Sequence, residues 1–473
     1  TKMNIKYYLP LIYLFPTSIV AQHTNTAIDR ELKVAIPKLT DLSATISENK
    51  EDYSTEINDE QLADNPNLIS HFLNLAVDQK QEMLIPKLIE MYRKYPQRDL
   101  ILVDYAQGAY FHSIQDYKKA IKLYSNLLKT HPYLDKVRFK LAQWLFEDTQ
   151  LSNAEEQFNQ LKNATLPNFI NKQIALYQEA IKEKQEINFN IKFSYIKDNN
   201  INNASSEPYI YIGSTKFKKT EESLPQKAEG IQYQLNINKI HNIKDNHNIY
   251  IENELEGKYY WNNKEYNDIN NRFYLGYQYQ NANNRFAFLP YYEKRWYSQK
   301  QYSNENGIRL ELDKRLSNQW QFSTSSEFAQ TRYKHSSQKR KKQLYSGTLV
   351  HILSPKTALY LGSDILFENT HQKRNNSNRY SLRLGASHQI KNLFSTQITL
   401  QVAKRYFKGN DLFVAKKRKD TEWNFSATIW KKEWNLWGII PKLNYRYQKI
   451  NSNIPEFFSF HKHQLNLFFE KNY

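Results

Sequence analysis

The last stretch of the chain, HQLNLFFEKNY (His463–Tyr473), alternates between two kinds of side chain. One face would carry Leu465, Leu467 and Phe469, and the opposite face Gln464, Asn466 and Phe468. Successive side chains of a β-strand point to opposite faces. The pattern therefore predicts a strand with one apolar face and one largely polar face.

The same pattern recurs from 188 to 473, in stretches of roughly ten residues. Short connections are expected at 240–247, 280–284, 315–319, 353–357, 390–393 and 431–435. Long ones are expected at about 199–228, 259–271, 297–306, 333–342, 369–378, 406–421 and 449–460. Six short turns and seven long loops make 13 connections, which predicts a 14-stranded antiparallel barrel. Connections that alternate between short and long are typical of outer-membrane barrels.

Composition excludes a bundle of membrane-spanning helices. Mean hydropathy is −0.78, and no stretch after the first 21 residues approaches the roughly 18 continuous apolar residues of a membrane helix. A transmembrane β-barrel remains possible, because only alternate residues of its strands face lipid. The 35 Tyr, 25 Phe and 8 Trp residues suit the aromatic girdles of such a barrel.

Charge and cysteine content narrow the possible partners. The chain has no cysteine and a net charge of +18. Disulfides, thiol catalysis, cysteine metal sites and a lipidated N-terminal cysteine are therefore excluded. No recognition helix, zinc finger or OB-like motif accompanies the charge, so we expect no nucleic-acid partner. The positive charge suits lipopolysaccharide phosphates or an acidic protein.

Two segments precede the first domain. Residues 1–21 are predicted to be a secretory signal peptide, with Lys6 in a positive start, an apolar stretch at 7–20 and Ala21 at the cleavage position. Residues 22–65 are polar and acidic with poor periodicity, which predicts a mobile segment.

Residues 66–187 have helical periodicity and a self-similarity of 34 residues. Small, small, aromatic and proline positions recur in two units: Gly108, Ala120, Tyr124 and Pro132, then Ala142, Ala154, Phe158 and Leu166–Pro167. This spacing matches tetratricopeptide (TPR) repeats, in which small residues let paired helices approach and the aromatic residue fills the groove between repeats. With a degenerate unit at about 67–98, the sequence predicts a short periplasmic TPR solenoid directly before the barrel. Its concave face would bind a protein or be purely structural.

Three basic runs fall in loops that are expected outside the cell. The densest comprise Lys339, Arg340, Lys341 and Lys342, then Lys373 and Arg374, then Lys416, Lys417, Arg418 and Lys419. Such charge is either solvated or paired with lipopolysaccharide phosphates, or it docks an acidic exported protein. The first and third runs are the candidate substrate-docking residues.

The sequence gives no indication of catalysis. It has no Walker, GxGxxG, GxSxG or HExxH motif, and its histidines are scattered. His461 and His463 share a strand face and could bind a metal, but polar lumen or loop histidines are the simpler interpretation. We expect no catalytic residues, no cofactor and no metal.

The order of signal peptide, TPR domain and C-terminal barrel resembles the Slam family, the surface lipoprotein assembly modulators of Gram-negative bacteria. The local features behind this resemblance are DNNINNA (Asp198–Ala204), PKLNY (Pro441–Tyr445) and the end of the chain. In that ending, Leu465, Leu467, Phe469 and Tyr473 fit a barrel insertion signal, whereas Lys471 replaces a usual hydrophobic residue. The resemblance implies an outer-membrane translocon whose partners are surface lipoproteins or secreted proteins, outer-membrane lipid, the barrel-assembly machinery and periplasmic chaperones.

On this hypothesis the TPR face holds an acidic or partly unfolded substrate, which then enters the lumen or a seam between the first and last strands. An open strand edge is a template for added strands. Two alternatives remain: a polysaccharide-export porin with a TPR domain, which needs lumenal rings of one charge, and an outer-membrane lipid hydrolase, which needs a Ser–His pair. The expected inward residues are mostly neutral amides, namely Gln232, Gln234, Asn236, Asn238, Gln278, Gln280 and Gln401, with Thr399. They favour protein transport.

Overall fold

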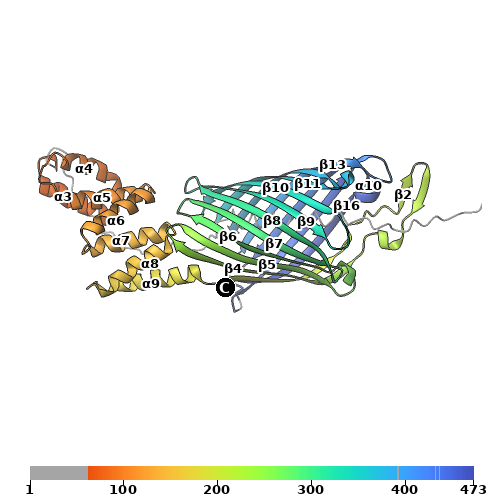
Figure 1. Cartoon of the computed structure of the whole chain (residues 1–473), viewed down its shortest axis with the longest axis horizontal. Helices are drawn as coiled ribbons and strands as arrows, with labels where there is room; N and C mark the ends of the chain where they lie inside the picture. Colours follow the sequence, from red (N-terminus) through yellow and green to blue (C-terminus); the bar gives the residue numbers. More distant parts are fainter. Residues whose placement is uncertain (1–61, 391–393, 432, 436, 473) are drawn as a thin grey trace, which may run out of the picture.

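The computed structural model describes residues 62–390, 394–431, 433–435 and 437–472. The predicted signal peptide and nearly all of the expected mobile segment lie outside these residues, as does Tyr473. A helical domain at one end adjoins a closed barrel (Figure 1). The predicted architecture, TPR-type helices followed by a 14-stranded antiparallel barrel, is confirmed. No helix among the described residues is long and apolar enough to cross a membrane.

The helical domain consists of consecutive antiparallel helices. They are α3 (Pro66–Asp78), α4 (Ile85–Tyr92), α5 (Leu100–Ser113), α6 (Tyr117–Thr130), α7 (Asp135–Glu147), α8 (Leu151–Gln160) and α9 (Asn168–Gln185), with short 3-10 turns η1 (Glu82–Leu84) and η2 (Leu161–Asn163). Side chains cap several starts: Asn65 accepts two backbone N–H bonds at α3, and Asp99 does the same at α5.

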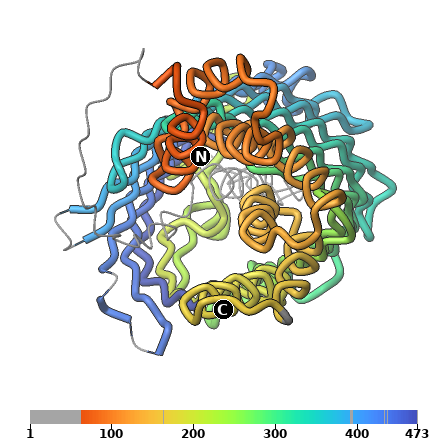
Figure 2. Tube along the Cα trace, turned by 90° about the vertical axis from the view of Figure 1, so that its left-hand side faces the viewer, coloured from red at the N-terminus to blue at the C-terminus, as the bar shows by residue number. Residues whose placement is uncertain are grey.

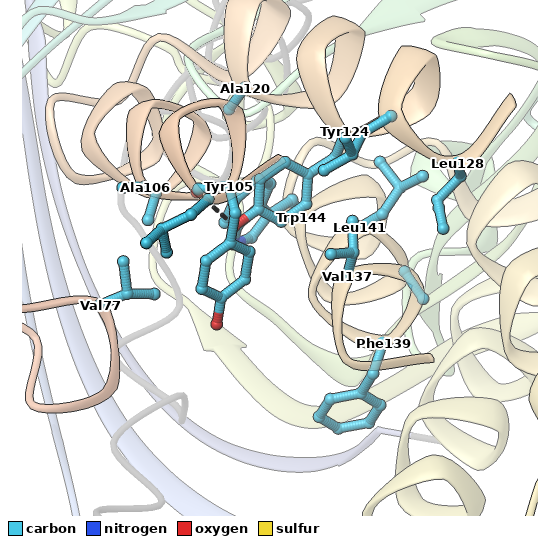
Figure 3. Packing of buried hydrophobic residues seen from close by; sticks show 14 of the residues in the cluster. Val77, Tyr105, Ala106, Ala120, Tyr124, Leu128, Val137, Phe139, Leu141 and Trp144 are labelled. Atoms are coloured by element: carbon cyan, nitrogen blue, oxygen red, sulfur yellow. Dashed lines mark hydrogen bonds between the residues drawn. The ribbon is translucent and has the colours of Figure 1, made fainter. Parts of the chain in front are cut away.

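Close approach of α5 and α6 depends on Gly108. A Cβ there would lie 2.3 Å from Cε1 of Tyr124. The Tyr124 ring lies 4.2 Å from that of Trp144, and its hydroxyl donates to the Tyr105 carbonyl oxygen at 2.8 Å (Figure 3). The other small and aromatic positions of the two repeats are fully buried: Ala120, Ala142, Ala154 and Phe158. Pro132 follows the end of α6 at Thr130.

The barrel closes by pairing its first and last strands. In chain order the strands are β1 (Asn188–Asp198), β4 (Ala228–Lys244), β5 (His247–Tyr260), β6 (Asp268–Gln280), β7 (Asn284–Tyr297), β8 (Lys300–Arg315), β9 (Trp320–Tyr333), β10 (Lys339–Ser354), β11 (Thr357–Thr370), β12 (Ser377–Ile390), β13 (Phe394–Asn410), β14 (Lys417–Trp430), β15 (Ile439–Ser452) and β16 (Phe460–Asn472). Each pairs antiparallel with its neighbours in chain order, and β1 joins β16 to β4.

Polarity across the barrel wall is reversed relative to a soluble protein. Large apolar side chains on the outer face are exposed, for example Phe193, Leu275, Leu382 and Leu467. Buried inward positions carry arginine, glutamate and amide side chains instead. An exterior of this kind needs an apolar solvent. The alternation predicted for β16 is also observed, with Leu465, Leu467 and Phe469 facing outward.

Most connections at the end distant from the helices are shorter than predicted, whereas the one predicted at about 199–228 spans 199–227. The predicted loop 297–306 is a two-residue turn, in which Ser298 and Gln299 have φ of +52° and +63°. The connection predicted at 333–342 spans only 334–338, and that at 406–421 only 411–416. Most strands have 13 to 17 residues, whereas about 9–11 suffice to cross a bilayer. Strand ends beyond the lipid are polar on both faces, so their sequence is indistinguishable from that of loops.

The connection after β1 is the longest and has structure of its own. It contains the hairpin β2 (Tyr209–Ile212) and β3 (Thr215–Lys218), followed by η3 (Glu221–Ser223). This hairpin and the short helix α10 (Pro455–Phe458) lie at the barrel end opposite the helical domain (Figure 1). Two other connections on that side contain η4 (Lys264–Tyr266) and η5 (Lys373–Asn375).

Candidate functional site

The helical domain and the barrel meet almost without a linker, since α9 ends at Gln185 and β1 begins at Asn188. Viewed from the helical end, the helices follow an arc around one mouth of the barrel (Figure 2). The short barrel turns lie at this mouth, and those after β4, β6 and β8 contact the helical domain. The domain therefore lies where a polypeptide would enter or leave the lumen.

A polar joint connects the α7–α8 turn to two barrel turns. The Asp148 carbonyl oxygen accepts from Asn246 Nδ2 at 2.7 Å, and its carboxylate accepts from the backbone N–H of Ala282 at 3.0 Å. Thr149, at φ +62°, donates its hydroxyl to the Gln280 carbonyl oxygen at 2.6 Å. Because Asp148 and Asn246 are buried, these bonds are shielded from water and specify one orientation of the domain.

The start of α8 extends the joint. The backbone N–H of Ser152 donates to Asn242 Oδ1 at 2.9 Å, and its hydroxyl donates to the Asn242 carbonyl oxygen at 3.1 Å. Asn153 Nδ2 donates to Asp245 Oδ1 at 2.7 Å, and on the next side of the mouth Gln115 Nε2 donates to Asn318 Oδ1 at 3.3 Å. The amide- and serine-rich turns give no hydrophobic signal, so the joint could not be found from periodicity.

Inside the barrel, charged side chains form a continuous chain of ion pairs. We call it the lumenal network; its members are Arg272, Arg285, Arg309, Arg340, Lys342, Arg379 and Arg405, with Glu293, Glu305, Glu311, Asp313, Glu327, Glu368 and Glu422. Seven cations face seven carboxylates, so the network is balanced in charge.

The centre of the network is the pair Glu305 and Glu327. Lys342 Nζ lies 3.0 Å from Glu305 Oε1 and 2.8 Å from Glu327 Oε1, and the Tyr291 hydroxyl lies 2.8 Å from both oxygens. Arg340 then bridges Glu305 to Glu368 on β11. Each carboxylate serves several donors, so the strands β6 to β14 are tied together across the lumen wall.

The opposite wall combines amide side chains with ion pairs such as Lys442–Glu470 and Lys462–Asp198. Inward positions of β4 carry Gln232, Gln234, Asn236 and Asn238, as predicted, and β16 adds Gln464 and Asn466. The predicted inward amides do face the lumen, Gln278 and Gln401 among them, but β6–β14 also carry the lumenal network, which was not predicted. Charged residues at every second position, such as Arg309, Glu311 and Asp313, indicate this network in the sequence.

The seam between β1 and β16 is the least paired junction of the barrel. Among the described residues, seven pairs join these strands, against eleven between β1 and β4 and twelve between β15 and β16. No pair is formed at 196–197. Side chains also cross the seam. Gln464 Nε2 donates to Asp198 Oδ2 at 2.6 Å, and Asn190 Nδ2 donates to Glu470 Oε1 at 2.9 Å. Lys462 Nζ lies 3.6 Å from Asp198 Oδ2, and Lys192 Nζ lies 5.0 Å from the centroid of the Phe468 ring.

The expected loop placement of two basic runs is wrong. Lys339–Lys342 begins β10, and Lys417–Lys419 begins β14. Strand alternation leaves one set exposed, namely Lys339, Lys341, Lys417 and Lys419, with Lys416 just before the strand. The alternate positions Arg340, Lys342 and Arg418 are buried. Arg340 and Lys342 pair with Glu368 and Glu327 of the neighbouring strands, and Arg418 pairs with Asp420 of its own strand. These three cations are therefore not available to a docking protein. Lys373 and Arg374 do lie in a connection, within η5.

The histidines of the described residues make no bond to a serine hydroxyl. His463 Nδ1 lies 2.7 Å from the Tyr445 hydroxyl, His388 Nδ1 lies 2.9 Å from Thr357 Oγ1, and His351 stacks on Trp320. Within the same ranges no group of three histidine or acidic side chains could hold a metal ion.

These features define a class of protein: a transmembrane β-barrel with a polar lumen that contains a charge-balanced ion-pair network, and a TPR-type domain fixed at one mouth. The sequence model of the surface lipoprotein assembly modifier matches residues 188–473, and that of the same family's N-terminal TPR repeats matches residues 55–158. The chain belongs to the surface lipoprotein assembly modifier family, which confirms the resemblance to Slam proteins.

Relatives match over nearly the whole chain. Identity to surface lipoprotein assembly modifier 1 of Haemophilus influenzae is 30% over 469 residues, covering 96% of this chain and 95% of that protein. The hemophilin secretion modulator of Acinetobacter baumannii is 24% identical over 90% of this chain and 88% of its own length. Among solved structures, a bacterial polysaccharide outer membrane secretin covers 61% of this chain and 99% of its own, with 10% identity and a TM-score of 0.34, too low to bear on function.

Proposed function

We propose that this chain is an outer-membrane translocon that moves surface lipoproteins or related secreted proteins to the cell surface without chemical catalysis. The observation that carries the proposal is the polar joint, which holds a TPR-type domain against the mouth of a barrel with a polar lumen. Solenoid repeats present extended surfaces for proteins. The names of the relatives, which speak of surface lipoprotein assembly and hemophilin secretion, support the same conclusion.

We place the helical domain in the periplasm. It joins the end of the barrel with short turns, and short turns are periplasmic in outer-membrane barrels. The long connection with β2 and β3 would then lie outside the cell, as would the exposed Lys339, Lys341, Lys416, Lys417 and Lys419. These five lysines are placed to meet lipopolysaccharide phosphates or an acidic substrate.

The seam is the favoured route for the substrate. Strands β6 to β14 are tied by the lumenal network, whereas among the described residues only seven backbone pairs join β1 to β16, the fewest of any junction. Separation there breaks the fewest contacts and offers free strand edges to an extended substrate. We expect barrel assembly to need the barrel-assembly machinery and periplasmic chaperones, with Leu465, Leu467, Phe469 and Tyr473 as the insertion signal.

Deletion of the gene in its own host tests the proposal. Intact cells are labelled with a membrane-impermeant biotin reagent, and the labelled lipoproteins and the secreted proteins are quantified. We expect a small set to disappear from the surface or medium while remaining in the periplasm, and to return with the intact gene. A gene lacking residues 62–186 should insert its barrel but restore little export. An unchanged surface proteome after deletion would refute the function.

A disulfide lock tests the route, because the chain has no cysteine of its own. Ser194 lies opposite Phe468 across the seam, and along the same row Gln232 lies opposite Lys258 between β4 and β5. Hydrogen-bonded and non-bonded pairs alternate along such a row, so the two pairs share one geometry. Locking Ser194→Cys/Phe468→Cys should stop export reversibly with reductant, whereas Gln232→Cys/Lys258→Cys should not. Equal export by both oxidised variants would indicate passage through the closed lumen.

Neither alternative function gains support. A polysaccharide porin needs lumenal rings of one sign of charge, and the lumenal network pairs seven cations with seven carboxylates. A lipid hydrolase needs a serine activated by a histidine, and the described histidines bond to other groups.

A further inference from the structure

Two lysines and a tyrosine converge on one face of the helical domain, away from the barrel joint. Lys136 and Lys140 are four residues apart on α7 and therefore share a face. Their Nζ atoms lie over the Tyr105 ring of α5, at 5.5 Å and 5.3 Å from its centroid. Asp78, the last residue of α3, completes the group and lies 2.7 Å from Lys136 Nζ. We call these four residues the α3–α5–α7 cluster.

The two lysines differ in their partners. Lys136 is paired with Asp78. Among the residues that the structure describes, no carboxylate lies within ion-pair distance of Lys140. Lys140 is half-buried, and burial lowers its pKa to about 8. The Lys140 ammonium has lost water and gained the face of the Tyr105 ring but no contacting carboxylate, so an anion bound there would stabilise its charged form. Its position is therefore better explained by a ligand than by folding.

Tyr105 gives independent evidence. Its side chain is buried. Within the described part of the chain its O–H has no acceptor, since the neighbouring Lys136 ammonium is itself a donor. The Tyr105 ring stacks on that of Tyr124, with 5.8 Å between centroids, and Figure 3 shows its hydroxyl pointing away from Tyr124 and Trp144. Buried hydroxyls are normally satisfied. A phenol O–H and an ammonium on one face are both donors, so they share one missing partner: an anionic oxygen acceptor.

The net charge of the groups around Lys140 indicates the sign of the ligand's charge. The groups that face Lys140 are Asp78 and Lys80 at the end of α3, Glu82 of η1 and Lys136 of α7. With Lys140, three ammonium groups face two carboxylates, which leaves one positive charge. The first helices of successive TPR pairs, α3, α5 and α7, line the face on which solenoids bind extended chains.

We infer that the α3–α5–α7 cluster is a binding site for a carboxylate of the exported polypeptide, held by Lys140 and Tyr105. The inference rests on the proposed function and names the chemistry by which the helical domain holds its substrate. A single carboxylate site gives a weak, reversible hold, because one ion pair in partial contact with water contributes little affinity. That suits a substrate that must be released into the barrel.

The test measures binding to the full-length protein in detergent. One probe is a fluorescent glycine–serine peptide with spaced glutamates and both ends capped; the other is a neutral peptide with a free C-terminal carboxylate. A lysine peptide is the negative probe. Binding of the first assigns side-chain carboxylates, and binding of the second assigns the chain terminus. Lys140→Gln should weaken binding about tenfold, whereas Lys122→Gln, the same charge change on α6, should not.

Two further variants separate binding from folding. Tyr105→Phe keeps the ring and removes a hydroxyl that has no partner, so it should weaken binding without loss of helical structure. Because the ammonium of Lys140 is lost as pH rises through about 8, binding should fall between pH 7 and pH 9, and Lys140→Arg should keep it.

Three outcomes would overturn the inference. They are failure of both carboxylate probes, equal weakening by Lys140→Gln and Lys122→Gln, and probe binding that requires removal of residues 41–60. The last would mean that the acidic segment of this chain is the occupant. None of these three outcomes would change the conclusion of the export experiment. Conversely, an unchanged surface proteome after gene deletion would refute the function even if the peptides bind.

Discussion

Replacement of Asp364 should show how strongly the lumen wall depends on paired charge. Arg383 on β12 is fully buried, and its Nε and Nη2 lie 2.9 Å from the two carboxylate oxygens of Asp364 on β11. Nη2 also donates to the hydroxyls of Ser346 and Thr348, at 2.9 Å and 3.0 Å. Gly362 leaves space for the guanidinium, since a Cβ there would lie 2.7 Å from Arg383 Cζ.

The expected loss of stability depends on which charged group remains buried without a partner of opposite charge. In Asp364→Ala the guanidinium keeps two neutral hydroxyl partners but loses the carboxylate with which it is paired, which costs about 3–5 kcal/mol for a buried pair. In the double variant Asp364→Ala/Arg383→Met no charge remains uncompensated. Its cost should be at most about 2 kcal/mol, since buried pairs replaced by apolar groups are often near neutral. The double variant should therefore be more stable than Asp364→Ala alone.

The assay is urea unfolding of the purified barrel in detergent, followed by the loss of β-sheet circular dichroism and by the band shift on gels. Glu433→Ala, an exposed carboxylate in the turn before β15, is the matched control and should leave stability unchanged. A double variant at least as destabilised as the sum of its singles would refute the reasoning. So would an Asp364→Ala barrel as stable as the parent.

Three further changes have defined outcomes. Gly108→Ala should lower the free energy of unfolding of the helical domain by about 1–3 kcal/mol, since its Cβ would overlap the Tyr124 ring. Faster hydrogen exchange in α5 and α6 would show this loss of stability, and exchange rates equal to those of the parent would contradict the packing. Ser298→Asn/Gln299→Gly should raise the urea midpoint of the barrel, because both positions have positive φ; a lower midpoint would contradict this. Asp148→Ala should speed amide exchange at the turn after β6 by roughly tenfold or more, and unchanged exchange would mean that the joint does not depend on this carboxylate.

Much of the fold was predictable from alternation alone. A transmembrane strand must present apolar groups to lipid and polar groups to the lumen, so each strand shows a period of two in its own sequence. The same locality holds for the repeats, where Gly108 and Tyr124 lie within one helical pair. Strand ends were predicted less well, because outside the lipid neither face needs to be apolar. For that reason Lys339–Lys342 was assigned to a loop although it begins β10.

The candidate sites depended on contacts between residues far apart in the chain. Asp148 and Ala282 are joined by one hydrogen bond, and Tyr105 and Lys140 by one cation–π contact. No periodicity links such positions, because a polar contact is specified by the geometry of two separate elements rather than by spacing along one of them. Only the paired strands show which carboxylate faces which guanidinium.

The sequence by itself therefore determined the class of protein: a helical repeat domain, a barrel of 14 strands, and the lipid-facing side of each. These properties are local, since each strand or helix encodes them without knowledge of its neighbours. The tertiary structure alone decided the balanced lumenal network, the weakly paired seam between β1 and β16, the joint at Asp148 and the unpaired Lys140. Each of these is a relation between elements, fixed only when strand register and helix packing bring the partners together.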